Sequence, residues 1–221
     1  MTTAPVYVTL AWGLTVVVIA GASLRGFTRF RQLPPSLRAL TWFAGFETLM
    51  EVVNKSLIKV FHFQSNLFLL PLDAIGTVGL LALAYSYALQ SAAFSRLMPW
   101  VLGAFSSYVL FDTLAGLGTV RYTPSVQVIG DLLMLSLAGL YFQKLLNELR
   151  VVRLGRDPFF WMSVGTVIYT LGDLQLSLFG NYILHHVPLQ AQLITLSLVR
   201  ISLLFVFYGS CCLALWMRPQ R

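Results

Sequence analysis

Charged side chains are scarce in this sequence. Asp, Glu, Lys and Arg together make up 10% of its 221 residues, whereas hydrophobic residues make up 57%. Soluble domains carry roughly a quarter charged residues, so this composition excludes a soluble globular domain and predicts an integral membrane protein. Because a membrane-spanning helix needs about 20 mostly apolar residues, a chain of this length has room for about seven of them.

Signatures of several classes of membrane protein are missing. A retinal Schiff base needs a lysine deep in a helix, but the last apolar run, 189–216, contains no lysine. The DRY triplet and the NPxxY motif of animal-type receptors are absent, and the dipeptide PQ occurs only in the tail. Retinal proteins, animal-type receptors and PQ-loop sugar carriers are therefore not expected.

Specific enzyme and cofactor motifs are missing as well. The sequence has no GxSxG, HExxH or P-loop motif, so it predicts neither an enzymatic activity nor a cofactor. The adjacent Cys211 and Cys212 lie in an apolar run and are interpreted as small apolar residues. The net charge of +7 does not indicate nucleic acid, because the basic residues lie between apolar runs and form no soluble basic face.

What the sequence does contain is a series of long apolar runs. No run alternates polar and apolar residues with the period of two that a transmembrane barrel requires. Proline, which suits the first turn of a helix, stands near the start of most runs, including Pro99 in the fourth. We therefore predict one all-α domain, 1–221, a bundle of seven transmembrane helices at about 6–24, 37–61, 67–90, 98–118, 124–146, 158–181 and 189–216.

Arginines are distributed unequally between the two sets of loops. No Lys or Arg precedes the first run, whereas three arginines lie between the first run and the second, and a fourth, Arg38, stands at the start of the second. Positive residues favour the cytoplasmic side, so the pattern predicts an outside N-terminus and a cytoplasmic C-terminus. The predicted outer loops contain Arg121, while the predicted cytoplasmic side collects Arg25, Arg29, Arg31, Arg38, Arg96, Arg150, Arg153, Arg156, Arg218 and Arg221.

The few acidic residues fall largely inside the apolar runs. The segment FETLMEVVNKSLIKVFHF, 46–63, carries four ionisable residues, each four residues after the one before it. An ionised side chain at the bilayer centre costs about 3 kcal/mol by insertion scales, so such residues should face the bundle interior and pair. A rise of about 1.5 Å per residue places most of them in one layer of the outer half. The candidate residues for binding a ligand or a proton are Glu47, Glu51, Lys55, Asp73, Asp112, Asp131, Asp173 and Arg200.

Two interpretations of this layer remain open. It is either a paired network that fixes helix packing, or a pocket reached by water from outside that binds a ligand, a cation or protons. Six acids against two deep bases favour the pocket, with Asp112 and Asp131 among its solvated members. For the pairs, we expect Arg200 to contact Glu51 or Asp173, and Lys55 to contact Asp73.

Three functions follow from a polar pocket. The first is a sensor that binds a small ligand, a cation or a proton and signals to a partner protein. The alternatives are a small proton- or cation-coupled transporter or channel, and an intramembrane metal-dependent hydrolase. The hydrolase would need a zinc site made from His62, His185, His186 and Asp73, but their spacing carries no recognised ligand signature. We therefore expect no metal.

The segment RDPFFWMSVGTVIYTLGD, 156–173, followed by GNYIL, 180–184, carries a resemblance. The chain resembles a group of small bacterial seven-helix membrane proteins that are neighbours of sensor histidine kinases. The resemblance implies a signalling role in the bacterial inner membrane, with a histidine kinase or another membrane protein as partner. It supplies no ligand and no site residues, and it leaves a homo-oligomer open.

Overall fold

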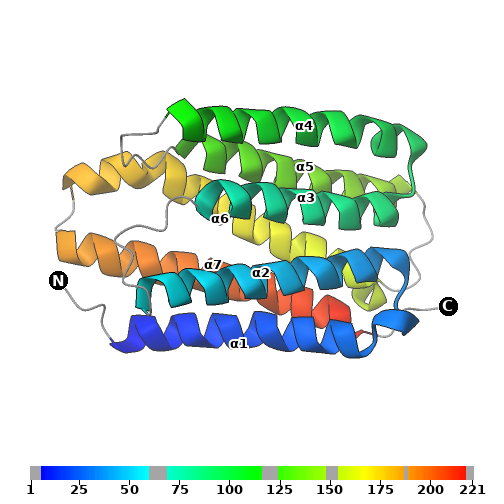
Figure 1. Cartoon of the computed structure of the whole chain (residues 1–221), viewed down its shortest axis with the longest axis horizontal. Coiled ribbons are helices and arrows are strands. Elements are labelled where there is room, and N and C mark those ends of the chain that lie inside the picture. The colour runs from blue at the N-terminus through cyan, green and yellow to red at the C-terminus, as the bar shows by residue number, and fades with distance from the viewer. Residues whose placement is uncertain (1–5, 60–68, 116–123, 148–153, 187–188, 218–221) are drawn as a thin grey trace.

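The computed structural model describes residues 6–59, 69–115, 124–147, 154–186 and 189–217. Within these ranges the regular elements are all helical, which confirms the all-α class. Seven α-helices follow one another together with two short 3-10 helices, η1 (Phe30–Gln32) and η3 (Leu154–Arg156) (Figure 1). The α-helices are α1 (Val6–Thr28), α2 (Pro35–Lys59), α3 (Leu70–Leu89), α4 (Ala92–Ala115), α5 (Pro124–Asn147), α6 (Pro158–His186) and α7 (Leu189–Trp216).

Five stretches of these helices are long and apolar enough to cross a membrane: Leu10–Thr28, Leu70–Leu89, Ala92–Ala115, Ser125–Asn147 and Leu196–Trp216. They belong to α1, α3, α4, α5 and α7, so the protein is membrane-embedded. Helix α2 has 25 residues, which is long enough, but it carries the charged residues Glu47, Glu51, Lys55 and Lys59. Charge, not length, separates α2 from the five apolar helices.

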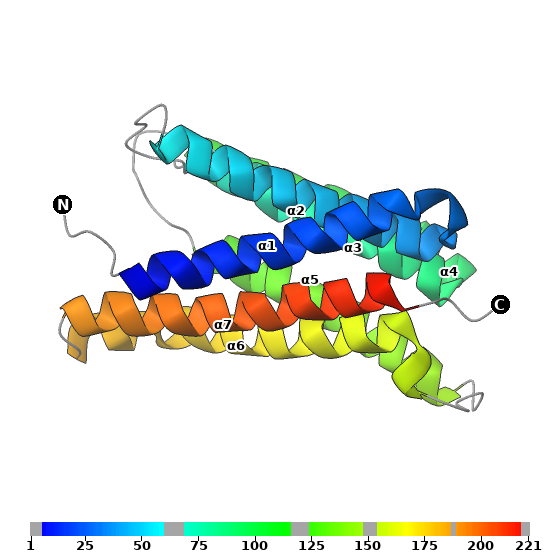
Figure 2. The ribbon, with the colours of Figure 1, turned by 90° about the horizontal axis from the view of Figure 1, so that it is seen from below.

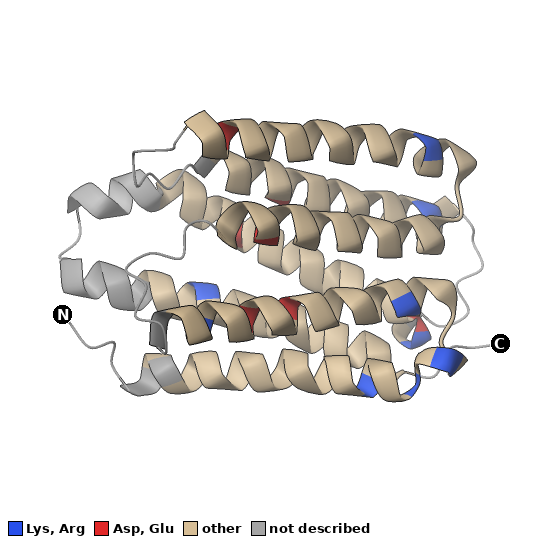
Figure 3. Ribbon diagram, in the orientation of Figure 1, with Lys and Arg blue, Asp and Glu red and all other residues tan. Residues whose placement is uncertain are grey.

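The helices lie roughly along one common axis, and α1 begins at the end of the bundle opposite to the end where α7 finishes (Figures 1 and 2). In the described part of the chain, most Lys and Arg positions gather at the end where α7 finishes (Figure 3). Most acidic positions lie in the middle or in the opposite half. This separation agrees with the arginine bias of the sequence.

Six of the helices form a closed ring. Around it, α1 packs on α2, α2 on α3, α3 on α5, α5 on α6, α6 on α7, and α7 on α1. Helices α2 and α7 also contact each other across the ring. Helix α4 lies outside the ring, at the edge of the bundle, where it packs on α3 and less extensively on α5 (Figure 1).

The prediction that Pro99 stands near a helix start is wrong. Helix α4 begins at Ala92, and Pro99 lies inside it. The start is set by Ser91, whose carbonyl accepts the Ser95 amide at 3.0 Å and whose hydroxyl accepts the Phe94 amide at 3.5 Å. Serine is a favoured residue before the first helical turn, and here it moves the helix start ahead of the apolar run.

Other predicted bounds need smaller corrections. Helix α1 continues to Thr28 and α6 to His186, four and five residues beyond the predicted ends at 24 and 181, and the predicted end of α4 at 118 lies outside the described residues. Apolar runs mark the part of a helix that is buried in lipid or protein. The ends of such runs are therefore uncertain by several residues as predictors of helix ends.

Two glycines let α6 and α7 approach closely. A Cβ atom added at Gly165 would collide with the Ser210 side chain, and one added at Gly172 would collide with Leu203. Small residues at such contacts allow backbones to pack closely in membrane proteins. Gly172 directly precedes Asp173, so this close approach also sets the distance between Asp173 and helix α7.

Candidate functional site

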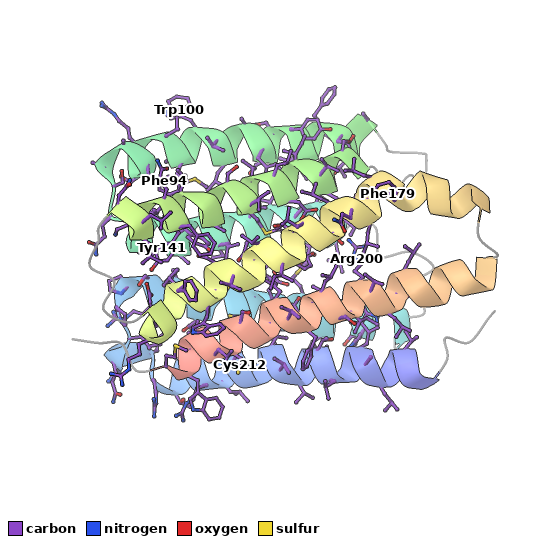
Figure 4. The ribbon with its side chains drawn as sticks, turned by 180° about the vertical axis from the view of Figure 1, so that it is seen from behind. Phe94, Trp100, Tyr141, Phe179, Arg200 and Cys212 are labelled. Carbon is purple, nitrogen blue, oxygen red and sulfur yellow. The ribbon has the colours of Figure 1, made fainter. Side chains whose placement is uncertain are left out.

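An ion pair joins α6 to α7 inside the ring. The Arg200 Nε atom lies 3.2 Å from Asp173 Oδ1, and an Arg200 NH2 group donates to Asp173 Oδ2 at 3.4 Å. The Asp173 side chain is 1% exposed and the Arg200 side chain 42% exposed. Figure 4 shows Arg200 between α6 and α7. The predicted pairing of Arg200 with Asp173 is confirmed.

Helix α5 contributes two residues beside this ion pair. The Gln127 amide donates to Asp173 Oδ2 at 2.6 Å. One turn further along, Asp131 is 0% exposed and interacts electrostatically with Asp173 and Arg200. Neither carboxyl oxygen of Asp131 has a hydrogen-bond partner among the described residues. Asp131 is therefore the least satisfied buried group of the site.

The two carboxyl groups of Asp131 and Asp173 are close enough to share a hydrogen bond if one of them carries a proton. Ionised carboxylates only accept hydrogen bonds, so two ionised groups would repel each other and leave Asp131 without a donor. A protonated Asp131 donates to Asp173 and removes one charge. The geometry thus fits one proton held between two buried acids, with Arg200 as the counter-charge of the other acid.

A second acidic centre lies between α2, α3 and α7. Glu47 is buried, and it accepts hydrogen bonds from the Thr77 hydroxyl at 2.5 Å and from the Tyr208 hydroxyl at 3.0 Å. Glu51 and Asp73 interact electrostatically with Glu47. The three helices therefore place three acids within range of one another, and Tyr208 connects them to the helix that carries Arg200.

Lys55 pairs differently from the prediction. Lys55 interacts electrostatically with Glu51, and Asp73 with Arg200, Glu47 and Glu51; no ion pair between Lys55 and Asp73 is found among the described residues. The Lys55 ammonium also lies over the Trp12 ring, 5.6 Å from its centroid. Glu51 and Lys55 are one turn apart on α2, which makes their interaction a local consequence of the helix.

Asp112 is the candidate that the structure does not bring to the others. It is half-buried on α4, the helix outside the ring, and no contact between it and the acidic centres is found among the described residues. The residues that a zinc site would need cannot be assessed from the described side chains: His62 lies outside the described residues, and the side chains of His185 and His186 are not described either. Among the residues that were described, no group of three or more His, Cys, Asp or Glu could hold a metal ion.

A stripe of buried hydroxyl residues runs along α6 toward the end of the bundle that carries most Lys and Arg. Ser163, Thr166 and Thr170 are all buried, and they occupy the same helix face as Asp173, at spacings of three or four residues. Thr166 and Thr170 donate to the Met162 and Thr166 carbonyl oxygens, each at 2.8 Å.

The stripe continues into tyrosines near that end. The Tyr85 and Ser163 hydroxyls are 2.9 Å apart, and Tyr141 donates to Asp157, which precedes α6. Sequence reasoning missed the hydroxyl residues of α6 because single Ser and Thr residues are common in membrane helices. The signal was their spacing to Asp173, which follows the helical period.

The predicted water-filled pocket at the acidic centres stays a prediction. Two surface pockets stand out in the described structure. One is lined by Phe27, Thr28, Arg29, Phe30, Arg31, Gln32 and Trp42, and the other by Pro99, Trp100, Gly103, Ala104 and Ser107. Neither touches the acidic residues of the ring, and Asp131 is fully buried. Asp131 is therefore shielded from the surface, whereas Arg200 in the same cluster is 42% exposed.

Comparison with known proteins adds no assignment. No protein-family model, no curated protein and no solved structure matches this chain. The acidic cluster and its geometry therefore carry the functional argument.

Proposed function

We propose that this protein is a membrane sensor that binds a proton, or a small cation in its place, at the acidic cluster and signals to a partner through helix packing. The observation that carries the proposal is Asp131, a fully buried carboxyl group without a hydrogen-bond donor beside the Asp173–Arg200 ion pair. Buried charged groups that lack partners are costly, and in membranes they commonly mark functional sites.

The charge balance supports a bound positive charge. The cluster contains the bases Lys55 and Arg200 against five acids: Glu47, Glu51, Asp73, Asp131 and Asp173. If all were ionised, three negative charges would remain uncompensated in a largely buried region. A proton is the simplest ligand, because it neutralises a carboxylate without needing a cavity, and the two pockets that stand out lie elsewhere.

Proton binding changes helix packing through the contacts of the site. Asp131, Asp173 and Arg200 lie on α5, α6 and α7, so gain or loss of a proton alters the attraction between three neighbouring helices. A ligand shifts such an arrangement only if it binds one conformation better than another. Deprotonated Asp131 repels Asp173, which favours separation of α5 from α6.

The topology completes the proposal. Helices α2 and α6 join the five apolar helices in crossing the membrane, with the N-terminus outside and the arginine-rich end in the cytoplasm. The protein acts in a bacterial inner membrane, where the cytoplasmic helix ends contact a histidine kinase or another membrane partner. The length of α2 and α6, their places in the ring and the clustering of Lys and Arg at one end support this arrangement.

Infrared difference spectroscopy of the purified protein in nanodiscs tests the site. We expect acidification to produce a protonated-carboxyl C=O band that is reduced in Asp131→Asn and retained in the matched control Asp112→Asn. The asparagine amide can donate to Asp173 as a protonated Asp131 does, so the variant should fold. If added Na⁺ or K⁺ suppresses the same band, that cation competes with the proton for the site. Identical spectra for the wild type and Asp131→Asn would reject the proposal.

A coupled transporter is the second candidate, and the hydroxyl stripe on α6 is the observation that favours it. Ser163, Thr166 and Thr170 lead from Asp173 toward the end of the bundle rich in Lys and Arg, and hydroxyl groups can both donate and accept hydrogen bonds. A transporter needs a polar route to each side of the membrane. The stripe supplies one half of such a route.

Proton flux in liposomes separates the two functions. Protein is reconstituted with a pH-sensitive dye inside the vesicles, and a pH gradient is imposed. If the protein is a transporter, the pH gradient decays faster in liposomes that contain it than in empty liposomes. Ser163→Ala should slow this decay, whereas the exposed control Ser136→Ala should not. A sensor leaves the gradient as stable as in empty liposomes and still shows the carboxyl band of Asp131.

A further inference from the structure

A surface pocket lies at the turn between α1 and α2. Its volume is about 500 Å³, and it is lined by Phe27, Thr28, Arg29, Phe30, Arg31, Gln32 and Trp42. The pocket therefore combines two arginines with three aromatic rings and two polar side chains. It stands at the end of the spanning stretch Leu10–Thr28, where a membrane helix leaves the apolar layer.

The turn that shapes the pocket is held by Arg38. Its Nε donates to the Leu33 carbonyl at 2.8 Å, and an NH2 group donates to the Arg31 carbonyl at 3.1 Å. The Arg38 guanidinium also lies 5.7 Å from the centroid of the Phe30 ring. Arg38 thus uses its hydrogen bonds to fix the backbone and is not part of the pocket lining.

Arg29 and Arg31 are engaged differently from Arg38. The described residues supply no acidic partner for either guanidinium, and the ion pair described above involves other residues. Both arginines line the pocket, so an anion bound there meets two positive charges. Guanidinium groups bind phosphate oxygens with favourable paired geometry.

The aromatic side of the pocket, formed by Phe27, Phe30 and Trp42, indicates whether the anion is a soluble phosphate or a lipid headgroup. The rings of Phe27 and Trp42 meet edge to face at 5.6 Å, and Phe30 lies 6.0 Å from Trp42. Phe27 and Trp42 are both substantially exposed. A soluble phosphate makes no apolar contact with exposed aromatic rings. A phospholipid does, because it carries acyl chains beside its phosphate group. Aromatic residues next to basic ones are typical of the membrane interface.

We propose that this pocket binds the headgroup of an anionic phospholipid, with the phosphate on Arg29 and Arg31 and the upper acyl chain against Phe27 and Trp42. This site is independent of the acidic cluster and of the proposed sensor function. It lies at the junction of α1 and α2, so a bound lipid ties the loop to the membrane surface and holds the two helix ends together.

The test compares two double variants of equal charge. Arg29→Gln/Arg31→Gln removes the pocket arginines, and Arg96→Gln/Arg156→Gln removes two exposed arginines that do not line the pocket. Binding is measured by native mass spectrometry and by thermal stabilisation in detergent, with added phosphatidylglycerol, phosphatidylcholine or inorganic phosphate. Circular dichroism checks that each variant keeps its helices.

We expect phosphatidylglycerol to stabilise the wild type and the control variant. In the pocket variant its apparent affinity should fall about tenfold or more, because a basic residue near an anionic membrane surface contributes about 1 kcal/mol. Phosphatidylcholine and inorganic phosphate should have little effect on any variant. Equal losses in both double variants would mean diffuse attraction, and stabilisation by phosphate alone would mean a soluble-anion site. Either result overturns the proposal.

A second readout uses Trp42. In a variant whose other four tryptophans are replaced by phenylalanine, phosphatidylglycerol with brominated acyl chains should quench Trp42 fluorescence more strongly than brominated phosphatidylcholine. Adding Arg29→Gln/Arg31→Gln should remove the difference between the two lipids. If both brominated lipids quench Trp42 equally while Arg29 and Arg31 are still present, the aromatic rings contact bulk lipid only, and the proposed headgroup site is wrong.

Discussion

Arg200 on α7 and Asp173 on α6 form an ion pair with a 3.2 Å separation between Nε and Oδ1. The acid is 1% exposed and the base 42% exposed, so the pair reaches from the interior of the ring toward its surface. Gln127 on α5 binds the same carboxylate. One side chain thus connects three helices, and the stability of the bundle should depend on it.

Loss of the ion pair should destabilise the protein. Arg200→Leu leaves the buried Asp173 carboxylate without its counter-charge, and removal of one partner of a buried pair costs about 3 kcal/mol. We expect a loss of no more than about 3 kcal/mol for Arg200→Leu, because Arg200 is partly exposed. Unfolding by SDS in mild detergent measures the loss.

The double variant Arg200→Leu/Asp173→Asn should recover part of the stability lost in Arg200→Leu, because no uncompensated charge remains. The exposed control Arg96→Leu should have little effect. An Arg200→Leu variant as stable as the wild type would show that the pair contributes nothing.

Close packing of α6 on α7 gives a second prediction. Gly165→Ala introduces a Cβ atom that collides with the Ser210 side chain, and overpacking of this kind costs about 1–3 kcal/mol. Gly139→Ala on α5 is the matched control, because its Cβ meets nothing within 4 Å. Alanine also has the higher helix propensity, so the control should be neutral or slightly stabilising. Equal melting temperatures for both variants would contradict the α6–α7 interface.

The second acidic centre should depend on a single hydroxyl group. Tyr208→Phe removes the 3.0 Å hydrogen bond to buried Glu47, and loss of a donor to a charged buried group costs about 1.5–3 kcal/mol if Glu47 is ionised. If Glu47 carries a proton, the loss is smaller and should grow as the pH rises. The control Tyr87→Phe changes an exposed tyrosine. Melting temperature against pH for both variants checks the prediction.

The topology is tested by fusions to the C-terminal end. Alkaline phosphatase is active only outside the cytoplasm, so a fusion after Arg221 should be inactive, and green fluorescent protein at the same place should fluoresce. Fusions that end within the segment between α2 and α3 should give the opposite result. An active phosphatase after Arg221 would reverse the proposed orientation.

The apolar runs alone were enough to predict the helices. A long run of apolar residues in a membrane has one stable backbone arrangement, because only a helix satisfies its own hydrogen bonds there. The same reasoning predicted that Arg200 pairs with Glu51 or Asp173, since isolated charges in such runs must find partners, and the structure shows Asp173. It failed at Pro99, where Ser91 moved the helix start, and at the ends of α1 and α6, which continue past their apolar runs.

What only the tertiary structure decided is which acids meet. Asp112 and Asp131 look alike in the sequence, each a single acid in an apolar run, yet Asp131 lies in the ring next to Asp173 while Asp112 lies on the outer helix α4. Likewise, nothing local pairs Glu47 with Tyr208, which is 161 residues away. The period of one helix fixes which residues share a face, but the order of helices around the ring depends on packing between segments distant in the chain, and that order decides which charged faces meet.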